Sequence, residues 1–397
     1  MIKRRQFLKN VTAAGLGLQF LPRLSFAATA GAGDRKFILI ILRGGMDGLG
    51  AVPAHADPGY AALRGELAFG TNETLKLDGL FSLNPALKNL HGMFRAGQAS
   101  IIHAVASPYR SRSHFDGQDV LESGHNTALA GQTGWLGRLL SEAGEQEQTA
   151  IALSHGIPLV LRGSQNGTSW APSRLPGVDD DLIMRLKYLY QNDEMLKHSL
   201  EQAVMADKIA SSAMMGNKKR NFRQNIAISA GHAVKFLKAD SRLNIAILES
   251  YGWDTHVRQG TLKGPLANGL RDLDRGLGLI KSGLGQDWGN TVIAVVTEFG
   301  RTVWVNGNGG SDHGTAGVAF LAGGAINGGR IIADWPGLGK QNLYQERDLY
   351  PTTDIRAVFK GILHDHLRVS PDVIERKLFQ DSTKIRAMDG LIKKRPA

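Results

Sequence analysis

The stretch from Thr291 to Gly314, TVIAVVTEFGRTVWVNGNGGSDHG, constrains the fold more than any other part of this chain. It opens with an apolar, β-branched run over Thr291–Thr297, which predicts a strand buried on both faces. Buried strands of this kind belong to α/β sheets, whose ligands collect at the carboxyl ends of the strands. The sequence therefore predicts an α/β fold with a site beyond this strand.

The residues after the strand have the composition of a metal site. Glu298 follows the strand directly, and Asp312 and His313 come after the glycine- and asparagine-rich loop 306–310. Glycine lets a backbone fold closely around an ion, and carboxylate and imidazole groups are common ligands of divalent cations. The alternative is a buried strand that ends in ordinary polar surface residues.

Two more predicted strands end in the same way. The run Lys36–Leu42 leads to Asp47 between glycines, although an Asp-Gly turn would explain that residue too. Leu243–Glu249 leads to Asp254 and His256, which share one side of an extended loop because they are two residues apart. Acids and histidines at several strand ends of one sheet could hold one or two divalent cations (Zn, Mn, Mg or Ca).

A loop rich in hydroxyl and arginine side chains follows the predicted strand Ala99–Ala106. It includes Ser111 and Ser113 and leads into a predicted helix over His114–Glu122. A helix start binds anions through its unpaired N–H groups, so a serine there, beside Arg110 or Arg112, suits an anionic substrate. The alternative for Ser113 is an N-cap residue, and the two roles are compatible.

The amino terminus has the pattern of an export signal. Residues 1–30 contain the Arg4-Arg5 pair of a twin-arginine motif, a short apolar segment and small residues, with cleavage expected near Ala27 or Ala30. A basic amphipathic helix is the alternative. No other apolar run approaches the roughly 18 residues of a membrane span. We therefore expect a periplasmic or secreted protein, with the twin-arginine translocase as its partner during export.

Composition excludes several other classes. The chain has no cysteine, which rules out disulfides, thiolate metal sites and a cysteine nucleophile. Five of its formal +11 charges lie in residues 1–30, which leaves +6 on the remainder, and no basic run with interleaved aromatics suggests nucleic acid.

Residues 31–397 are expected to form one α/β domain with a helical, methionine-rich insertion at about 180–240. Packing or a cap explains the methionines, and a substrate gate is the alternative. Further helices are expected over Leu83–Arg95, Trp135–Gly144, Leu266–Leu284 and Pro351–Leu367, and strands around Ile151, Pro158–Leu161 and Val318–Leu321.

At these residues the sequence resembles the DUF1501 family, exported bacterial proteins of the alkaline phosphatase/sulfatase-like superfamily. The matching stretches are spread over nearly the whole of residues 31–397: LRGGMDGL, SPYRSRSHFDGQDVLESG, YGWDTH, TEFGRT, GGSDHGT, GGRIIADWPGL and RDLYPTTDIRAV. The resemblance implies three α/β/α layers with a mostly parallel central sheet.

The resemblance also implies roles for single residues. Asp47 matches the first-strand metal ligand, Ser113 (or Ser111) the nucleophile, Asp254 and His256 the middle ligands, Glu298 the strand-end acid and His313 the late histidine. Asp312 could replace a missing ligand, and Arg112, Arg301 and His114 would steady the anion or the leaving group.

Two departures from the superfamily pattern stand out. Phe299 occupies the place of a usual histidine, and the spacing from Asp254 to His256 is shorter than the usual one. Either departure is compatible with three alternatives: a single metal, a changed metal preference, or a site that has lost catalysis. Neither Ser111 nor Ser113 has the proline two residues on that formylglycine sulfatases require. The sequence therefore predicts an exported, metal-dependent hydrolase of a small anionic ester, with phosphate favoured over sulfate. The alternative is an exported binding or assembly protein without catalysis.

Overall fold

The computed structural model of this protein describes residues 35–70, 72–143, 149–172, 180–211 and 225–394. The export signal predicted for residues 1–30 lies outside the described residues, as do Met214 and Met215. Among the helices of the described segments, none is both long and apolar enough to cross a membrane.

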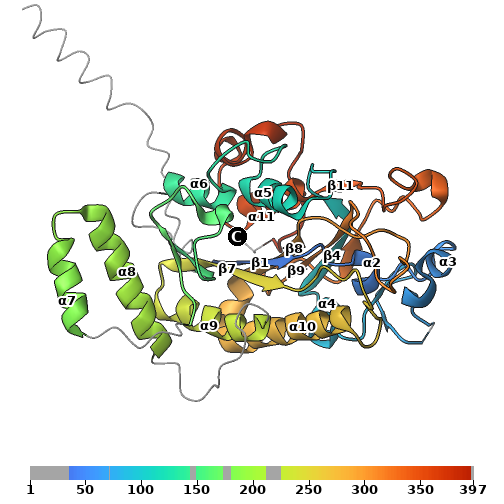
Figure 1. The fold of residues 1–397 in the computed structure, drawn as a ribbon, viewed down its shortest axis with the longest axis horizontal. Coiled ribbons are helices and arrows are strands. Elements are labelled where there is room, and N and C mark those ends of the chain that lie inside the picture. The colour runs from blue at the N-terminus through green and yellow to red at the C-terminus, as the bar shows by residue number, and fades with distance from the viewer. Residues whose placement is uncertain (1–34, 71, 144–148, 173–179, 212–224, 395–397) are drawn as a thin grey trace, which may run out of the picture.

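A nine-stranded sheet forms the centre of the molecule (Figure 1). Its strand order is β10-β4-β9-β8-β1-β7-β5-β6, and β11 pairs with β4 outside this path. β9 runs antiparallel to both of its neighbours, and the other pairings in the sheet are parallel. The prediction of a mostly parallel sheet is thus confirmed. The strands are β1 (Lys36–Arg43), β4 (Ala99–Ala106), β5 (Thr149–Leu153), β6 (Gly167–Ser169), β7 (Leu243–Tyr251), β8 (Thr291–Thr297), β9 (Gly317–Ala322), β10 (Arg330–Ile332) and β11 (Thr353–Asp354).

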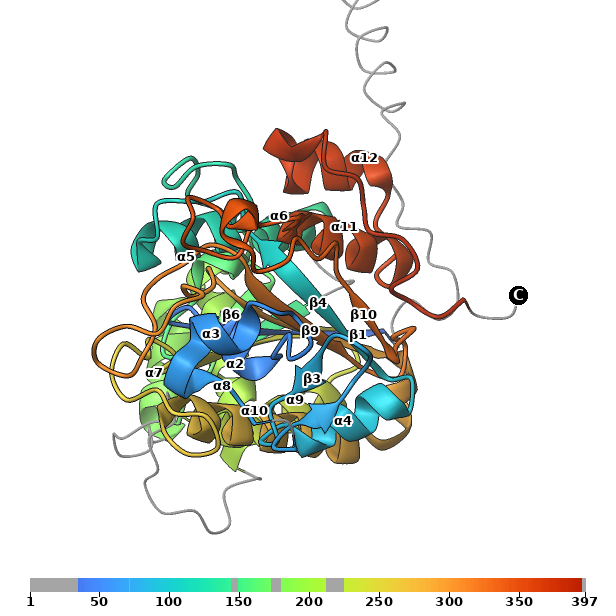
Figure 2. The same ribbon diagram turned by 90° about the vertical axis from the view of Figure 1, so that its right-hand side faces the viewer.

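Helices cover both faces of this sheet, which confirms the predicted three layers (Figures 1 and 2). One layer contains α5 (His114–Ser123), α6 (Trp135–Glu142), α11 (Ile355–Asp365) and α12 (Pro371–Val373). The opposite layer contains α4 (Lys88–Arg95), α9 (Ile226–Ala239) and α10 (Pro265–Leu284). At one end lie α2 (Gly48–Ala51), α3 (Tyr60–Arg64) and the small hairpin of β2 (Leu75–Lys76) and β3 (Ser82–Leu83).

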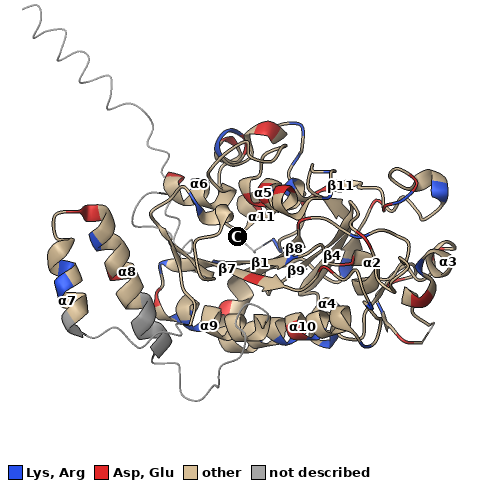
Figure 3. Ribbon diagram, viewed as in Figure 1, with Lys and Arg blue, Asp and Glu red and all other residues tan. Residues whose placement is uncertain are grey.

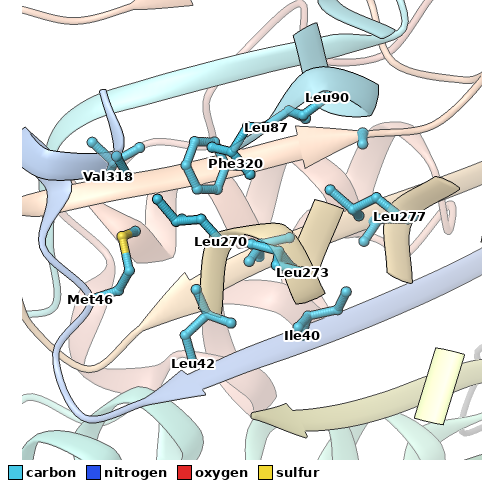
Figure 4. Close-up of a cluster of buried hydrophobic side chains, with 14 of the residues drawn as sticks. Ile40, Leu42, Met46, Leu87, Leu90, Leu270, Leu273, Leu277, Val318 and Phe320 are labelled. Atoms are coloured by element: carbon cyan, nitrogen blue, oxygen red, sulfur yellow. The ribbon is translucent and has the colours of Figure 1, made fainter. Parts of the chain in front are cut away.

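The two hydrophobic cores follow from the alternation of side chains along the strands. In β1, Ile38, Ile40 and Leu42 belong to one core, whereas the intervening residues belong to the other. In the first core, α10 places leucines from successive turns over β1 and β9, as its spacing of three and four predicts (Figure 4). Ten of the residues in Figure 4 are labelled: Ile40, Leu42, Met46, Leu87, Leu90, Leu270, Leu273, Leu277, Val318 and Phe320.

The described residues of the 180–240 region form three helices. α9 belongs to the layer beside α10, whereas α7 (Asp180–Leu189) and α8 (Glu194–Ser211) project from the body at the β6 edge of the sheet (Figure 1). Met184 and Met195 are exposed on this projection.

The expected strand at Pro158–Leu161 is wrong. Leu159–Leu161 form a single 3₁₀ turn in which the Arg162 amide donates to the Leu159 carbonyl. The amide of Val160 donates to the buried Glu122 carboxylate, so a side chain takes the place of a ladder partner. A short apolar run does not distinguish a strand from a buried turn.

Two expected helices begin too early. In the region 83–95 the helix begins only at Lys88, because the Asn84 side chain accepts from the Ala86 amide and holds a turn. In the region 351–367 the helix begins at Ile355. Its N-cap is Asp354, whose side chain accepts from the Arg356 amide.

Candidate metal centre

Three adjacent parallel strands end at one edge of the sheet. β1 lies between β7 and β8, with Arg43 opposite Tyr251 and Leu42 opposite Thr297. The segments that follow these strands therefore leave the sheet side by side. They contain Asp47, Asp254 with His256, and Glu298, as the sequence predicted.

Glycine allows these segments to approach one another closely. Gly44 has a φ of +127°, and a Cβ at this position would lie 2.6 Å from the Asp254 amide nitrogen. The Gly44 N–H donates to Glu298 Oε1 at 2.8 Å. A Cβ at Gly300 would lie 1.9 Å from the Ala316 carbonyl oxygen, so only glycine lets the chain from β8 pass the segment that presents His313.

Three histidines each donate an Nδ1 proton to a fixed acceptor. His114 Nδ1 lies 2.7 Å from Glu298 Oε1, and His256 Nδ1 lies 3.0 Å from Asp312 Oδ1. His313 Nδ1 lies 2.9 Å from the carbonyl oxygen of Arg112, which can only accept. These partners assign the Nδ1–H tautomer to each neutral ring, so each Nε2 carries a lone pair.

Those three Nε2 atoms converge. His313 Nε2 lies 3.0 Å from His114 Nε2 and 2.9 Å from His256 Nε2. The Asp254 carboxylate completes the group: Oδ1 lies 3.1 Å from His313 Nε2 and 3.0 Å from His256 Nε2. Oδ2 lies 3.5 Å from His114 Nε2. The result is a cluster of three Nε2 atoms and one carboxylate on four side chains, in which His114, Asp254 and His313 have ligand atoms within 4.8 Å of one another and His256 adjoins His313 and Asp254.

This donor set fits a divalent cation. Lone pairs facing one another at about 3 Å repel unless a cation or a proton lies between them. A tetrahedral Zn²⁺ with ligand bonds of about 2.1 Å holds its ligand atoms about 3.4 Å apart, close to the 2.9–3.1 Å between His313 Nε2 and the donor atoms of His114, His256 and Asp254. Nδ1 donation to a carboxylate or a carbonyl is also the usual support for metal-bound histidine.

Electrostatics keep the two central carboxyl groups ionised. Burial raises the pKa of Glu298, but hydrogen bonds from His114, Gln118 and Gly44 outweigh it and lower the pKa below its ordinary value. Burial also raises the pKa of Asp254, and the Arg301 guanidinium outweighs it. Arg301 Nη1 donates to Asp254 Oδ1 at 2.6 Å. The hydrogen bond to Glu298 raises the pKa of His114 above its ordinary value, although burial opposes it.

Glu298 and Asp312 lie one step outside this group. Both carboxylates contact the Nδ1 side of a ring and not the converging Nε2 side. These two hydrogen bonds therefore orient the rings of His114 and His256.

Asp47 is engaged elsewhere. Its carboxylate forms an ion pair with Arg64 and accepts from Gln259 Nε2 at 2.6 Å and from the Leu49 amide at 3.1 Å. Both charged side chains are almost completely buried. Gln259 in turn accepts from Ser311, whose hydroxyl also accepts from Arg301 at 3.3 Å. The first-strand acid is thus linked to the metal centre through a hydrogen-bonded chain and does not belong to the converging donors.

The serines and arginines of the hydroxyl-rich loop occupy different positions. Ser113 is the N-cap residue of α5, immediately before His114, and its side chain makes no capping hydrogen bond. Ser111 is exposed. The Arg112 side chain turns away to Asp348, with its Nε 2.8 Å from Oδ2, and only its carbonyl reaches His313. The Arg301 side chain is buried and faces Asp254.

Phe299 supports the centre in place of the imidazole expected there. Its ring lies 4.8 Å from the His114 ring and 5.1 Å from the His313 ring, measured between centroids, and it is buried. The third imidazole of the group comes from His114, on another element.

Sequence reasoning missed several residues of this centre. It gave His114 a role toward substrate, although the ring lies among the donors. Gln118, one turn later in α5, donates to Glu298 at 3.1 Å and also contacts Arg43 at 2.9 Å. The spacing of four between His114 and Gln118 places both on one face of the helix, and this signal could have grouped them.

A comparison with protein families decides the classification. The profile of the family described as "Protein of unknown function (DUF1501)" matches residues 96–378, which is most of the chain. The protein belongs to the DUF1501 family. No curated protein matches its sequence.

Solved structures with a similar arrangement include three bacterial enzymes or domains. The phosphonate monoester hydrolase of Agrobacterium radiobacter has 12% identity and a TM-score of 0.39, with 85% of this chain and 75% of that chain covered. The alkaline phosphatase of the Antarctic bacterium TAB5 has 13% identity and a TM-score of 0.36, with coverage of 75% and 94%. The C-terminal periplasmic domain of EcEptC from Escherichia coli, in complex with Zn, has 12% identity and a TM-score of 0.36, with coverage of 74% of each chain. At this level of similarity, only the residues of this DUF1501 protein define its chemistry.

Proposed function

We propose that this DUF1501 protein hydrolyses small anionic esters, phosphate in preference to sulfate, with one divalent cation held by His114, Asp254, His256 and His313. The observation that carries the proposal is that three Nε2 atoms lie beside the Asp254 carboxylate. Each ring donates its Nδ1 proton to an acceptor outside this group. A nitrogen-rich donor set favours Zn²⁺ over Mg²⁺ or Ca²⁺, which prefer oxygen ligands.

When bound, such a cation would polarise an ester oxygen and stabilise the negative charge that develops on it. The chain's own residues keep the centre in order. Arg301 holds Asp254 in place and ionised, and Glu298 and Asp312 hold two of the imidazoles in the tautomer that presents Nε2.

Ser113 is the proposed nucleophile. Its hydroxyl is not used as a cap, and the uncapped first turn of α5 offers N–H groups to the oxygens of an anionic ester. The Ser113 Oγ–phosphorus bond forms as the hydroxyl proton passes to water, and the ester P–O bond breaks as the departing alcohol takes up a proton from water. Water then releases phosphate and restores the serine. The exposed Ser111 is the second candidate.

A pair of serine variants tests this assignment. We expect Ser113→Ala to lower hydrolysis of p-nitrophenyl phosphate at least about 100-fold with its metal content unchanged, since the nucleophile and the ligands are separate groups. Ser111→Ala should retain activity when Ser113 is the nucleophile, and loss of activity in Ser111→Ala alone would assign that role to Ser111. Bis-p-nitrophenyl phosphate and p-nitrophenyl sulfate, each with Zn²⁺, Mn²⁺, Mg²⁺ or Ca²⁺, extend the screen. Full activity in Ser113→Ala would show that Ser113 is not the nucleophile.

The alternative is a binding or assembly protein that uses the cation structurally. Two observations favour it: Phe299 stands where the superfamily usually has histidine, and Arg64 neutralises Asp47. Cation binding with an intact fold and no turnover of any ester in the screen would support this alternative.

We also propose export through the twin-arginine pathway, on the basis of Arg4-Arg5 and the apolar segment that follows. The protein would then act in the periplasm or outside the cell. Arg4→Lys/Arg5→Lys should leave the protein in the cytoplasm, as cell fractionation would detect, and normal export of this variant would contradict the proposal.

A further inference from the structure

A second cleft lies beside the start of α11, away from the four side chains of the metal centre. Its volume is about 560 Å³. Three segments line it: the loop before α5, the residues around the start of α11, and a stretch near the carboxyl terminus. The polar lining residues are Arg110, Thr352, Thr353, Asp354, Lys384 and Arg386.

Positive charge predominates in this cleft. Lys384 and Arg386 are exposed, and within the described residues neither they nor Arg110 form an ion pair. The one lining acid, Asp354, is already held by Arg356 through two hydrogen bonds of 3.0 Å and 2.8 Å. Three cations thus face one cavity in which the single carboxylate is already compensated.

Arg110 is the most unusual of the three. It is partly buried, and its Nη1 donates to the carbonyl oxygens of Ser107 and Tyr109. Burial lowers the pKa of Arg110, as expected for a guanidinium that loses water without direct contact to a carboxylate. A charge held in this way is unfavourable in the empty cleft and becomes favourable when an anion arrives.

Two further features suit an oxyanion. The Thr352 hydroxyl oxygen is buried and has no hydrogen-bond partner among the described residues. The cleft also borders the first residues of the eleven-residue helix α11, the positive end of its dipole.

We propose that this cleft binds an oxyanion group, phosphate or sulfate, through Arg110, Lys384, Arg386 and the Thr352 hydroxyl. It is a second anion site, distinct from the metal centre, because none of the four converging donors lines it. The inference does not depend on ester hydrolysis. Arg110 lies four residues before His114, so an anion bound here contacts the same loop that carries Ser113.

Calorimetric titration with inorganic pyrophosphate tests the site. His313→Ala serves as the common background, which removes binding at the metal centre, so the result is independent of the proposed hydrolase activity. Lys384→Ala/Arg386→Ala and, separately, Arg110→Gln should each weaken pyrophosphate binding about tenfold or more, since charge-assisted hydrogen bonds are lost. The matched control is Lys235→Ala/Lys238→Ala, which removes two exposed charges from α9 in the opposite layer (Figure 3).

A second variant fills the cleft and leaves its charges in place. Ala357 lines the cleft, so Ala357→Trp should abolish pyrophosphate binding while Arg110, Lys384 and Arg386 remain. Sulfate titrated into the same proteins shows which of the two anions is preferred. Equal affinity in all variants, binding that survives Ala357→Trp, or no saturable binding in the background protein would overturn the proposal.

Discussion

Asp47 and Asp254 follow neighbouring strands of one sheet, yet they have opposite environments. The Asp47 side chain is 1% exposed and paired with Arg64, which is 0% exposed. The Asp254 side chain is 43% exposed and faces the Nε2 atoms of three imidazoles. A strand-end carboxylate can therefore become a metal ligand or half of a sealed ion pair. The side chain that the rest of the fold brings to it decides between them.

The comparison bears on the number of cations. The Arg64 guanidinium already compensates the Asp47 charge, so a divalent ion there would meet a like charge in a buried site. At Asp254 the Arg301 guanidinium leaves room for a cation, because the imidazole nitrogens still converge beside the carboxylate. We therefore expect one cation per chain.

The largest expected effect comes from breaking the buried ion pair of Asp47 and Arg64. Arg64→Met leaves the Asp47 charge buried without its partner and should lower the free energy of unfolding by about 3–5 kcal/mol, measured by urea denaturation. Adding Asp47→Asn, which keeps the cap on α2, should restore much of the loss. Wild-type stability in the single variant would mean that the pair is not sealed.

The second effect concerns pH and the buried His103, which lies near Asp47 and bonds to the Val52 carbonyl at 3.1 Å. Burial lowers the pKa of His103 to about 4 from its ordinary 6.5. The unfolded chain therefore binds the proton first, and stability should fall by roughly 3 kcal/mol as pH drops from about 6.5 to 4. His103→Gln should flatten this part of the pH–stability curve. An unchanged slope in the variant would assign the effect to other groups.

The third prediction compares Glu298 and Asp312, the two carboxylates that orient imidazole rings of the metal centre. Glu298 is buried and accepts from four groups, whereas the Asp312 side chain is 49% exposed. Glu298→Gln should weaken cation binding 10- to 100-fold by competition with a metal indicator. Asp312→Asn should have a smaller effect, because solvent screens its charge. The reverse order would show that burial does not govern this support.

The smallest effect sets the baseline for the others. Lys340 and Glu346 form an ion pair at 3.0 Å with side chains 72% and 67% exposed. Lys340→Ala should change the free energy of unfolding by no more than about 0.5 kcal/mol, since water screens such pairs. A loss of stability as large as that of Arg64→Met would contradict the distinction between buried and exposed ion pairs.

Much of the fold could be predicted from local patterns. The strands Ala99–Ala106 and Thr291–Thr297 have the predicted bounds, because mostly apolar runs of this length are characteristic of buried strands. The helices expected from 83 and from 351 begin later, since the Asn84 side chain holds a turn before α4 and Asp354, rather than an earlier residue, caps α11.

The candidate site was only partly accessible from sequence. Asp254, His256, Glu298 and His313 could be brought to one edge because parallel strands share their carboxyl ends. The pairing of Asp47 with Arg64 depends on how α3 packs against the loop after β1, and sequence spacing contains no signal for such a contact. The place of His114 among the donors depends in the same way on the approach of α5 to β8.

The metal content of the protein tests the central claim most directly. The full chain would be purified without chelator beside His313→Ala, with circular dichroism to verify that both are folded. We expect close to one divalent ion per wild-type chain and a large loss in His313→Ala. Two ions per chain, or the same content in both proteins, would contradict a single cation held by His114, Asp254, His256 and His313.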